Sequence, residues 1–184
     1  MARNISGILF LKMEFNKTYY QKEFEKLLDS KEKKKFFIKK SSASFKINKF
    51  IKKGVDSFEL ADFVNKSKLT AKNYWTIIIC YYSMLYLAKA VILTKGYETD
   101  DHYATQIALG HLLIPDKLKR EDLELLDQAH KIFEDEYIDY FEDARKESSI
   151  SRYSPSKVYA ERRIKEIMEI ARKFIEKIRI ILEE

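Results

Sequence analysis

The sequence predicts an all-α fold, an up-and-down bundle of four or five helices preceded by an N-terminal extension. Its 184 residues include only four Gly and two Pro, which leaves little material for the tight turns that join β-strands. Lys, Glu, Ile, Leu and Ala dominate the composition, and most of these residues favour helix. Apolar residues also recur at intervals of three and four positions, as one face of a helix requires.

The chain length corresponds to one domain with an extension. We expect residues 1–40 to form an N-terminal extension that is irregular or partly helical, and residues 41–184 to form the bundle. The apolar stretch GILFL at residues 7–11 is shorter than the apolar core of a secretory signal, and charged residues follow it. The single Cys80 excludes a disulfide framework within the chain and a zinc site built from several cysteines. We therefore expect a cytoplasmic protein.

The first helix of the bundle is predicted from apolar residues that recur every three or four positions. A Lys-rich segment precedes them and polar residues separate them, so the helix is amphipathic. The apolar positions are Ile47, Ile51, Val55, Phe58 and Ala61.

The second helix is predicted to begin after Thr70 as N-cap and to end at Gly96. It contains IIICYYSMLYLAKA, residues 77–90, which is apolar on nearly all sides and is therefore expected at the centre of the bundle. Its length would cross a membrane, but the polar residues within it favour a core helix and no membrane contact. A stripe of mostly small residues would let another helix approach closely, within the chain or in a dimer: Asn73, Thr76, Cys80, Ser83, Leu87 and Ala90.

The third helix is predicted between a capping aspartate, Asp100 or Asp101, and Leu113, with Pro115 ending it. A long fourth helix follows, with acidic residues on its polar face. Its apolar stripe consists of Leu123, Leu126, Phe133, Tyr137, Phe141 and Ala144.

The last helix is predicted after the serine-rich segment KESSISRYSPS, residues 146–156, which breaks the helical pattern. Short connections between successive helices place neighbours antiparallel in a bundle. The apolar positions of this helix are Ile164, Ile167, Ala171, Phe174, Ile178 and Ile181.

The net charge of +6 is distributed unevenly. Residues 31–53 contain ten Lys and one Glu, whereas residues 134–143 contain six acidic residues and no basic one. Lysines interleaved with phenylalanines can hold phosphates and stack bases. A solvated helix face above core phenylalanines explains the same pattern.

The motifs of the best-known enzyme classes are absent from the sequence: a phosphate-binding glycine loop, HExxH, paired CxxC and GxSxG. We expect no metal and no cofactor, since the three histidines are well separated and His130 falls on an apolar stripe, as core histidines do. Tyr82, Tyr86 and Lys89 are spaced to lie on one face of the central helix. Their polar ends either converge on a cleft or reach solvent at the edge of the bundle.

The central region resembles the prokaryotic HEPN domain. The resemblance is carried by NYWTIIICYYSMLYLAKAVILTKGYETDDH, residues 73–102, followed by QIALGHLL. It extends over about residues 45–184, because the helix with Ala171 and Phe174 looks like the family's final helix. The matching residues are Tyr81, Tyr82, Ser83, Met84, Ala88, Lys89, Lys95, Gly96 and His102.

This resemblance implies an all-α bundle that forms homodimers, binds nucleotides or RNA, and works beside a minimal nucleotidyltransferase in toxin–antitoxin or defence pairs. Many members are metal-independent endoribonucleases that carry an Arg, four to six residues, and then a His. Neither Arg145 nor Arg152 is followed by His at that spacing. The segment ARKESSISRY resembles members without this His, with Arg145 and Tyr153 as matches and Arg152 in place of an Asp. Tyr86 stands where many relatives have His.

We therefore expect a protein that binds a nucleotide or RNA as a nucleotidyltransferase partner, without nuclease activity of its own. One alternative is a metal-independent ribonuclease with a non-standard site made of Arg145, Arg152, His102 and a tyrosine. Another is a structural or oligomeric protein in which residues 31–53 bind residues 134–143 of the same chain or of a partner. The candidate binding residues are Tyr82, Tyr86, Lys89, His102, Arg145, Arg152 and Tyr153.

Overall fold

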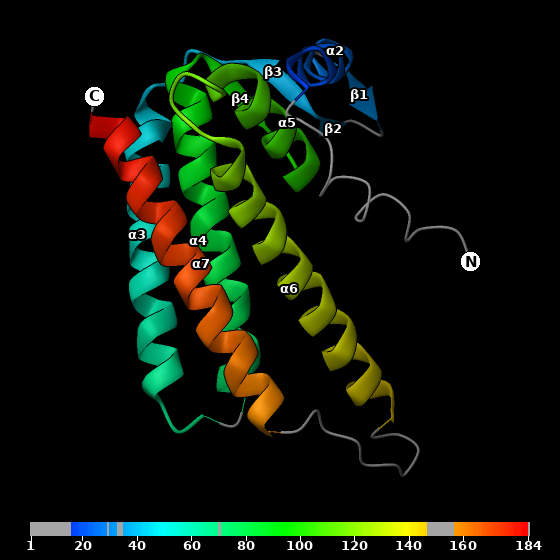
Figure 1. The fold of residues 1–184 in the computed structure, drawn as a ribbon, viewed down its shortest axis with the longest axis vertical. Helices are drawn as coiled ribbons and strands as arrows, with labels where there is room; N and C mark the ends of the chain where they lie inside the picture. The colour runs from blue at the N-terminus through cyan, green and yellow to red at the C-terminus, as the bar shows by residue number, and fades with distance from the viewer. Residues whose placement is uncertain (1–15, 29, 33–34, 70, 147–156, 184) are drawn as a thin grey trace.

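The computed structural model describes residues 16–28, 30–32, 35–69, 71–146 and 157–183 (Figure 1). These residues form mainly helices, and the predicted all-α class is confirmed. The helices are α2 (Lys17–Leu27), α3 (Phe45–Lys66), α4 (Lys72–Thr94), α5 (His102–Leu113), α6 (Arg120–Lys146) and α7 (Lys157–Glu183). Four short strands accompany them: β1 (Lys31–Glu32), β2 (Lys35–Phe36), β3 (Ile38–Lys40) and β4 (Tyr97–Thr99).

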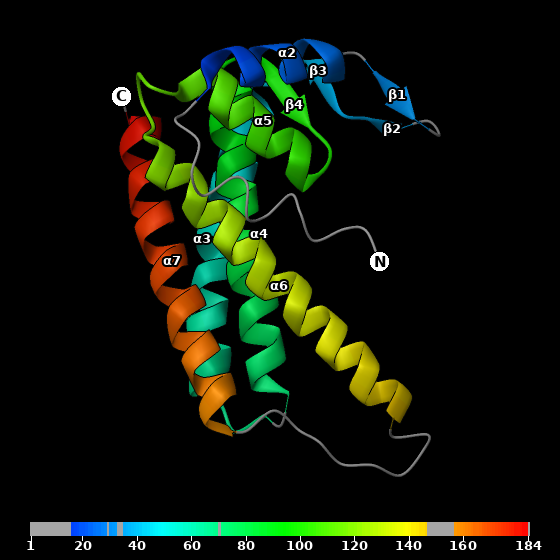
Figure 2. The ribbon, with the colours of Figure 1, turned by 45° about the vertical axis from the view of Figure 1, so that its right-hand side comes forward.

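The four long helices run up and down along the longest axis of the molecule, as predicted (Figure 1). The central helix, α4, packs against α3, α6 and α7. Helix α6 lies against α4 near its own N-terminus and diverges from it toward its C-terminal end in both views (Figures 1 and 2). Helices α2 and α5 and the strands cover one end of the bundle. One face of α4 therefore lies between α3 and α6.

Helix α4 forms the centre of the core because it is apolar on most of its circumference. Its residues Ile77, Met84 and Leu87 are completely buried, and Cys80 is buried among them. The helix is long and apolar enough to cross a membrane, but most of its apolar segment is buried inside the fold. Such burial is the usual property of a core helix in a bundle.

The small-residue stripe of α4 forms a seam with α3 inside the chain. The Ser83 hydroxyl donates a hydrogen bond of 2.6 Å to the carbonyl oxygen of Gly54. A Cβ atom added at Gly54 would lie 2.5 Å from Cγ of Leu87, so the two helices approach closely only because residue 54 has no side chain. Of the two predicted explanations, the structure supports the intramolecular seam.

Residues before the bundle contact it through one helix and one strand. Strand β3 pairs antiparallel with β4, with Ile38 opposite Thr99. Helix α2 packs on α5, where a Cβ atom at Gly110 would lie 2.3 Å from the Tyr20 ring. The sequence did not predict the strands, because segments of two or three residues are too short to show an alternating pattern. The boundary near residue 40 stays a prediction.

Two of the predicted helix ends follow capping rules. The Asp101 carboxylate accepts a hydrogen bond of 2.7 Å from the backbone N–H of Ala104, which confirms one of the two predicted caps of α5. Gly96 has φ +81° and follows the end of α4, as predicted. Ala71 precedes α4 without a side-chain cap, and the predicted cap Thr70 lies outside the described residues.

Candidate functional site

Five aromatic rings form a continuous row from α3 across α4 to α6. Their centroids are separated by 6.3 Å from Phe50 to Tyr86, 6.2 Å from Tyr86 to Tyr82, 5.9 Å from Tyr82 to Phe133 and 6.0 Å from Phe133 to Tyr137. These separations are typical of aromatic rings in contact. We call these five residues the aromatic row.

The aromatic row is partly open to solvent and differs in charge at its two ends. Tyr82 is 40% exposed and Tyr137 is 44% exposed. At the α3 end, the Lys53 ammonium lies 4.9 Å from the centroid of the Tyr86 ring, as in a cation–π contact. At the α6 end, Glu134 and Asp135 are exposed. An anionic ligand would therefore be attracted to the α3 end and repelled from the α6 end.

Behind the aromatic row lies a group of polar aromatic side chains from three helices, Tyr81, His102 and His130, which we call the histidine cluster. The two imidazole rings stack with centroids 3.7 Å apart and an interplanar angle of 8°. The Tyr81 hydroxyl lies 3.2 Å from Nδ1 of His102. The Tyr81 ring stacks on Phe133 with centroids 4.6 Å apart. Phe133 thus belongs to the aromatic row and also contacts the cluster.

The surroundings of the histidine cluster favour the uncharged form of its two imidazoles. Burial, together with the smaller effect of the neighbouring His130, lowers the pKa of His102 to about 3, although Asp127 acts in the opposite direction. Burial also lowers the pKa of His130, although Glu134 and Asp127 act in the opposite direction. Nε2 of His102 is buried and has no hydrogen-bond partner among the described residues. At neutral pH both imidazoles are therefore uncharged, and the low pKa of His102 makes its imidazole a weak base there.

Of the other sequence-predicted site residues, Lys89 and His102 have described side chains, and neither joins Tyr82 and Tyr86 in the aromatic row. The Lys89 ammonium donates a hydrogen bond of 2.8 Å to the backbone oxygen of Asp100, and burial lowers the pKa of Lys89. This contact ties α4 to the start of α5. Arg152 and Tyr153 lie outside the described residues. Arg145 lies near the end of α6, where the structure describes only the backbone.

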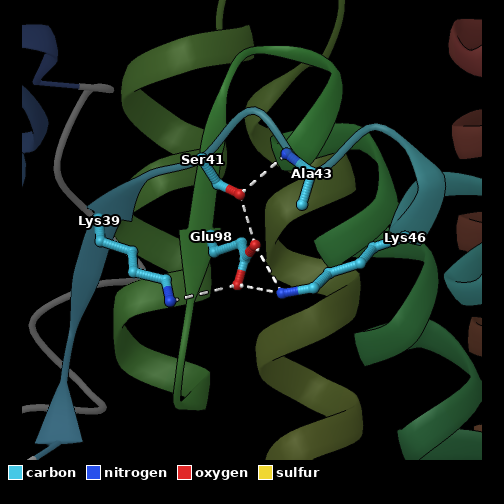
Figure 3. A network of polar contacts seen from close by, with 5 residues as sticks. All are labelled: Lys39, Ser41, Ala43, Lys46 and Glu98. Atoms are coloured by element: carbon cyan, nitrogen blue, oxygen red, sulfur yellow. Dashed lines mark hydrogen bonds and ion pairs between the residues drawn. The ribbon is translucent and has the colours of Figure 1, made fainter.

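A second polar group links the two paired strands to the start of α3 (Figure 3). The Glu98 carboxylate accepts hydrogen bonds of 2.9 and 3.1 Å from the Lys46 ammonium and one from the Ser41 hydroxyl. Lys39 lies 3.7 Å from the same carboxylate. Burial raises the pKa of Glu98, but the Ser41 and Lys46 hydrogen bonds and the charges of Lys46 and Lys39 lower it overall. We call these four residues the Glu98 network.

The two oppositely charged segments find partners elsewhere in the fold. Lys46 of the Lys-rich segment pairs with Glu98, and Lys52 pairs with Asp56 on the same helix. In the acidic segment, Asp135 and Glu136 lie 3.3 and 3.1 Å from the buried Arg163 of α7. Arg163, which ties α6 to α7, was not predicted from the sequence. None of these contacts joins the two segments to each other within the chain; binding between the segments of two chains stays a prediction.

The residues that could hold a metal are dispersed. Across the described part of the chain, no group of three or more His, Cys, Asp and Glu side chains has the arrangement of a metal site. The stacked imidazoles of His102 and His130 present their faces to each other, whereas metal ligation uses ring nitrogens aimed at one point.

Comparison with known proteins identifies one family. A family model described as the HEPN domain matches residues 47–181, which is well over half of the chain. No curated protein matches the chain. No solved structure matches it either.

Proposed function

The chain belongs to the HEPN domain family, and from this membership and the aromatic row we propose that it binds a nucleotide or single-stranded RNA without cleaving it. Helix α4, which carries the sequence resemblance, supplies Tyr82 and Tyr86 to the row. The family match includes α3 and α6 as well, so every ring of the row belongs to the HEPN domain.

The aromatic row is the observation that carries this proposal. Single-stranded nucleic acids are held by aromatic faces on which bases stack and by cations that follow the phosphates. Tyr82 offers an exposed ring, and Lys53 places a positive charge next to Tyr86. Lys49 is also exposed one turn before Lys53 on α3. The ligand would therefore lie along the α3–α4 half of the row, away from the acidic residues of α6.

The absence of catalysis is proposed from the sequence. Neither Arg145 nor Arg152 is followed by a His at the spacing found in HEPN ribonucleases. Without that pair, the family's way of holding phosphate charge and transferring protons is missing.

We also propose the partners that family membership favours. These are a second copy of the chain, in a homodimer, and a nucleotidyltransferase of a toxin–antitoxin or defence pair. A cytoplasmic location agrees with the burial of the one membrane-length helix in the described part of the chain. Co-purification of the tagged protein with products of neighbouring genes would test the nucleotidyltransferase partner.

Ligand binding can be tested with a short fluorescent single-stranded RNA of mixed sequence and with a fluorescent adenine nucleotide, both measured by anisotropy at low salt. Stacking contributes about 1–3 kcal/mol per base, which corresponds to roughly 5- to 150-fold in affinity. We expect Tyr82→Leu and Lys53→Gln each to weaken binding several-fold.

The controls remove the same chemical groups from another surface. Tyr103→Leu removes a tyrosine of similar exposure, 43%, on α5, and Lys22→Gln removes an exposed lysine on α2. Both should leave the affinity unchanged. Equal weakening by the controls, or no effect of Tyr82→Leu and Lys53→Gln, would overturn the proposed binding surface.

The histidine cluster favours one alternative, a metal-independent ribonuclease with a non-standard site. The two imidazoles lie next to the aromatic row, and Nε2 of His102 lacks a partner among the described atoms. Cleavage of a labelled RNA in the presence of a metal chelator, lost in His102→Ala and in Arg145→Ala, would support this alternative. RNA that stays intact after prolonged incubation with the protein would exclude it.

A further inference from the structure

A hollow lies where the ends of four elements meet, and none of its lining residues belongs to the aromatic row. It has a volume of about 420 Å³ and lies between the β3–α3 connection and the α4–β4 turn. Its walls are formed by Lys40, Ser41, Ser42, Lys95, Gly96 and Tyr97.

The backbone holds the two walls of this hollow together. Lys40 is paired with Tyr97 across the β3–β4 ladder. One residue further, the Ser41 N–H donates a hydrogen bond of 2.8 Å to the Gly96 carbonyl oxygen. Gly96, with φ +81°, makes the sharp turn that brings Lys95 to the hollow. Two lysines far apart in sequence are thus fixed at one place.

The hollow has an excess of positive charge. Lys40 and Lys95 are exposed, and neither forms an ion pair within the described residues. The nearby Glu98 carboxylate is already bound by Lys46, Lys39 and the Ser41 hydroxyl, so it is not available to neutralise them. The Ser42 hydroxyl makes no hydrogen bond to the described part of the protein and can donate one to a ligand.

We propose that this hollow binds a phosphate dianion, either free phosphate or the terminal group of a phosphomonoester. Lys40 and Ser42 line the hollow from one side and Lys95 from the other, so two ammonium groups and a hydroxyl are available to donate hydrogen bonds to a phosphate, and such charge-assisted hydrogen bonds are the strong ones. A dianion matches the two uncompensated lysines, whereas the phosphodiester of an RNA backbone carries one charge. The site goes beyond the proposed function, because none of its residues belongs to the aromatic row.

The test is a titration of the full chain, labelled with ¹⁵N, with inorganic phosphate, methyl phosphate or dimethyl phosphate at constant ionic strength. We expect phosphate and methyl phosphate to shift the backbone amide signals of Ser42 and Gly96 in a saturable way. Dimethyl phosphate, a singly charged diester, should bind at least tenfold more weakly. A preference for methyl phosphate over free phosphate would identify the terminal group of a phosphomonoester as the source.

Variants separate this site from general attraction of anions. Lys40→Gln combined with Lys95→Gln should weaken phosphate binding at least tenfold. Lys22→Gln combined with Lys165→Gln removes the same charge from exposed positions on α2 and α7 and should not. Tyr82→Leu should leave phosphate binding unchanged. The phosphate site and the proposed RNA-binding surface can therefore be tested, and refuted, separately. Equal binding of the diester, or equal effects of the two double variants, would overturn the proposal.

Discussion

The Glu98 network and the histidine cluster both hold partly or fully buried polar side chains, but they do so in opposite ways. In the network, a carboxylate is kept ionised by two ammonium groups and a hydroxyl. In the cluster, burial keeps both imidazoles neutral, and the neighbouring His130 adds to this effect at His102. The Glu98 network is stable when its carboxylate is ionised, whereas the histidine cluster is stable when its imidazoles are neutral. Acid and salt should therefore affect them differently.

The largest effect should come from removing the ring at the centre of the histidine cluster. Tyr81 is 3% exposed and contacts His102, His130 and Phe133. Tyr81→Ala would leave a cavity and remove these contacts, and such truncations of buried aromatic rings cost about 3–5 kcal/mol. Urea denaturation followed by circular dichroism measures the loss.

Tyr82→Ala is the matched control, because Tyr82 is the next residue on α4 and is 40% exposed. We expect it to cost about 1 kcal/mol or less. A similar loss in both variants would show that the histidine cluster is not part of the stable core.

Acid should destabilise the protein through the histidine cluster before it affects the Glu98 network. The folded-state pKa of His102 is about 3, below its ordinary value of 6.5, so the unfolded chain binds the proton first. The stability that the folded protein gains by holding His102 neutral is fully present above pH 6.5 and is lost as the pH falls toward 3. By pH 5 the loss would reach about 2 kcal/mol, as an upper limit. Unfolding free energies measured between pH 7 and pH 5 test this.

His102→Phe keeps a stacked aromatic ring but removes the titrating group, so its stability should vary less between pH 7 and pH 5. Glu98→Gln should keep the wild-type dependence in this range, since a carboxylate with a lowered pKa stays ionised there. An unchanged slope in His102→Phe would mean that another group is responsible.

The helices of the bundle were predictable from the sequence, whereas the strands that carry the Glu98 network were not. The spacing of Ile47, Ile51 and Phe58 predicts α3 because one helical face repeats every three to four residues. Strand β3 has three residues, and its partner β4 follows the whole of α3 and α4. No local pattern records a pairing between segments so far apart in the chain.

The candidate site was predictable only in part, for a related reason. Tyr82 and Tyr86 share one helix, so their spacing predicts that they lie on one face. Phe50, Phe133 and the His102–His130 stack come from different helices, and their contacts depend on how these helices pack. The position of His130 on the apolar stripe of α6 indicated burial, and the family resemblance singled out His102, but neither signal identified the two as partners.

Removing the negative charge of Glu98 should lower the free energy of unfolding by about 1 kcal/mol. Charge-assisted hydrogen bonds to a partly buried carboxylate stabilise the fold more than ion pairs on the surface do. The Glu98 side chain is 13% exposed. Glu98→Gln leaves Lys39 and Lys46 facing a neutral amide, and thermal unfolding at low salt measures the cost. High salt should reduce the difference from wild type. Glu169→Gln, which removes an exposed pairing with Lys173 on α7, should change stability little at either salt concentration.

The smallest expected effect is the loss of stability on replacing Lys39, the more weakly bound of the two lysines in the Glu98 network. Lys46 donates two hydrogen bonds to Glu98, whereas Lys39 lies 3.7 Å away and its side chain is 40% exposed. Exposed ion pairs at such distances contribute about 0–1 kcal/mol, so Lys39→Gln should cost a few tenths of a kcal/mol and Lys46→Gln more. Thermal unfolding of the two variants at low salt gives this ranking. If Lys39→Gln cost as much as Lys46→Gln, general attraction to the basic surface would explain the ionised state of Glu98 better than the hydrogen-bond geometry does.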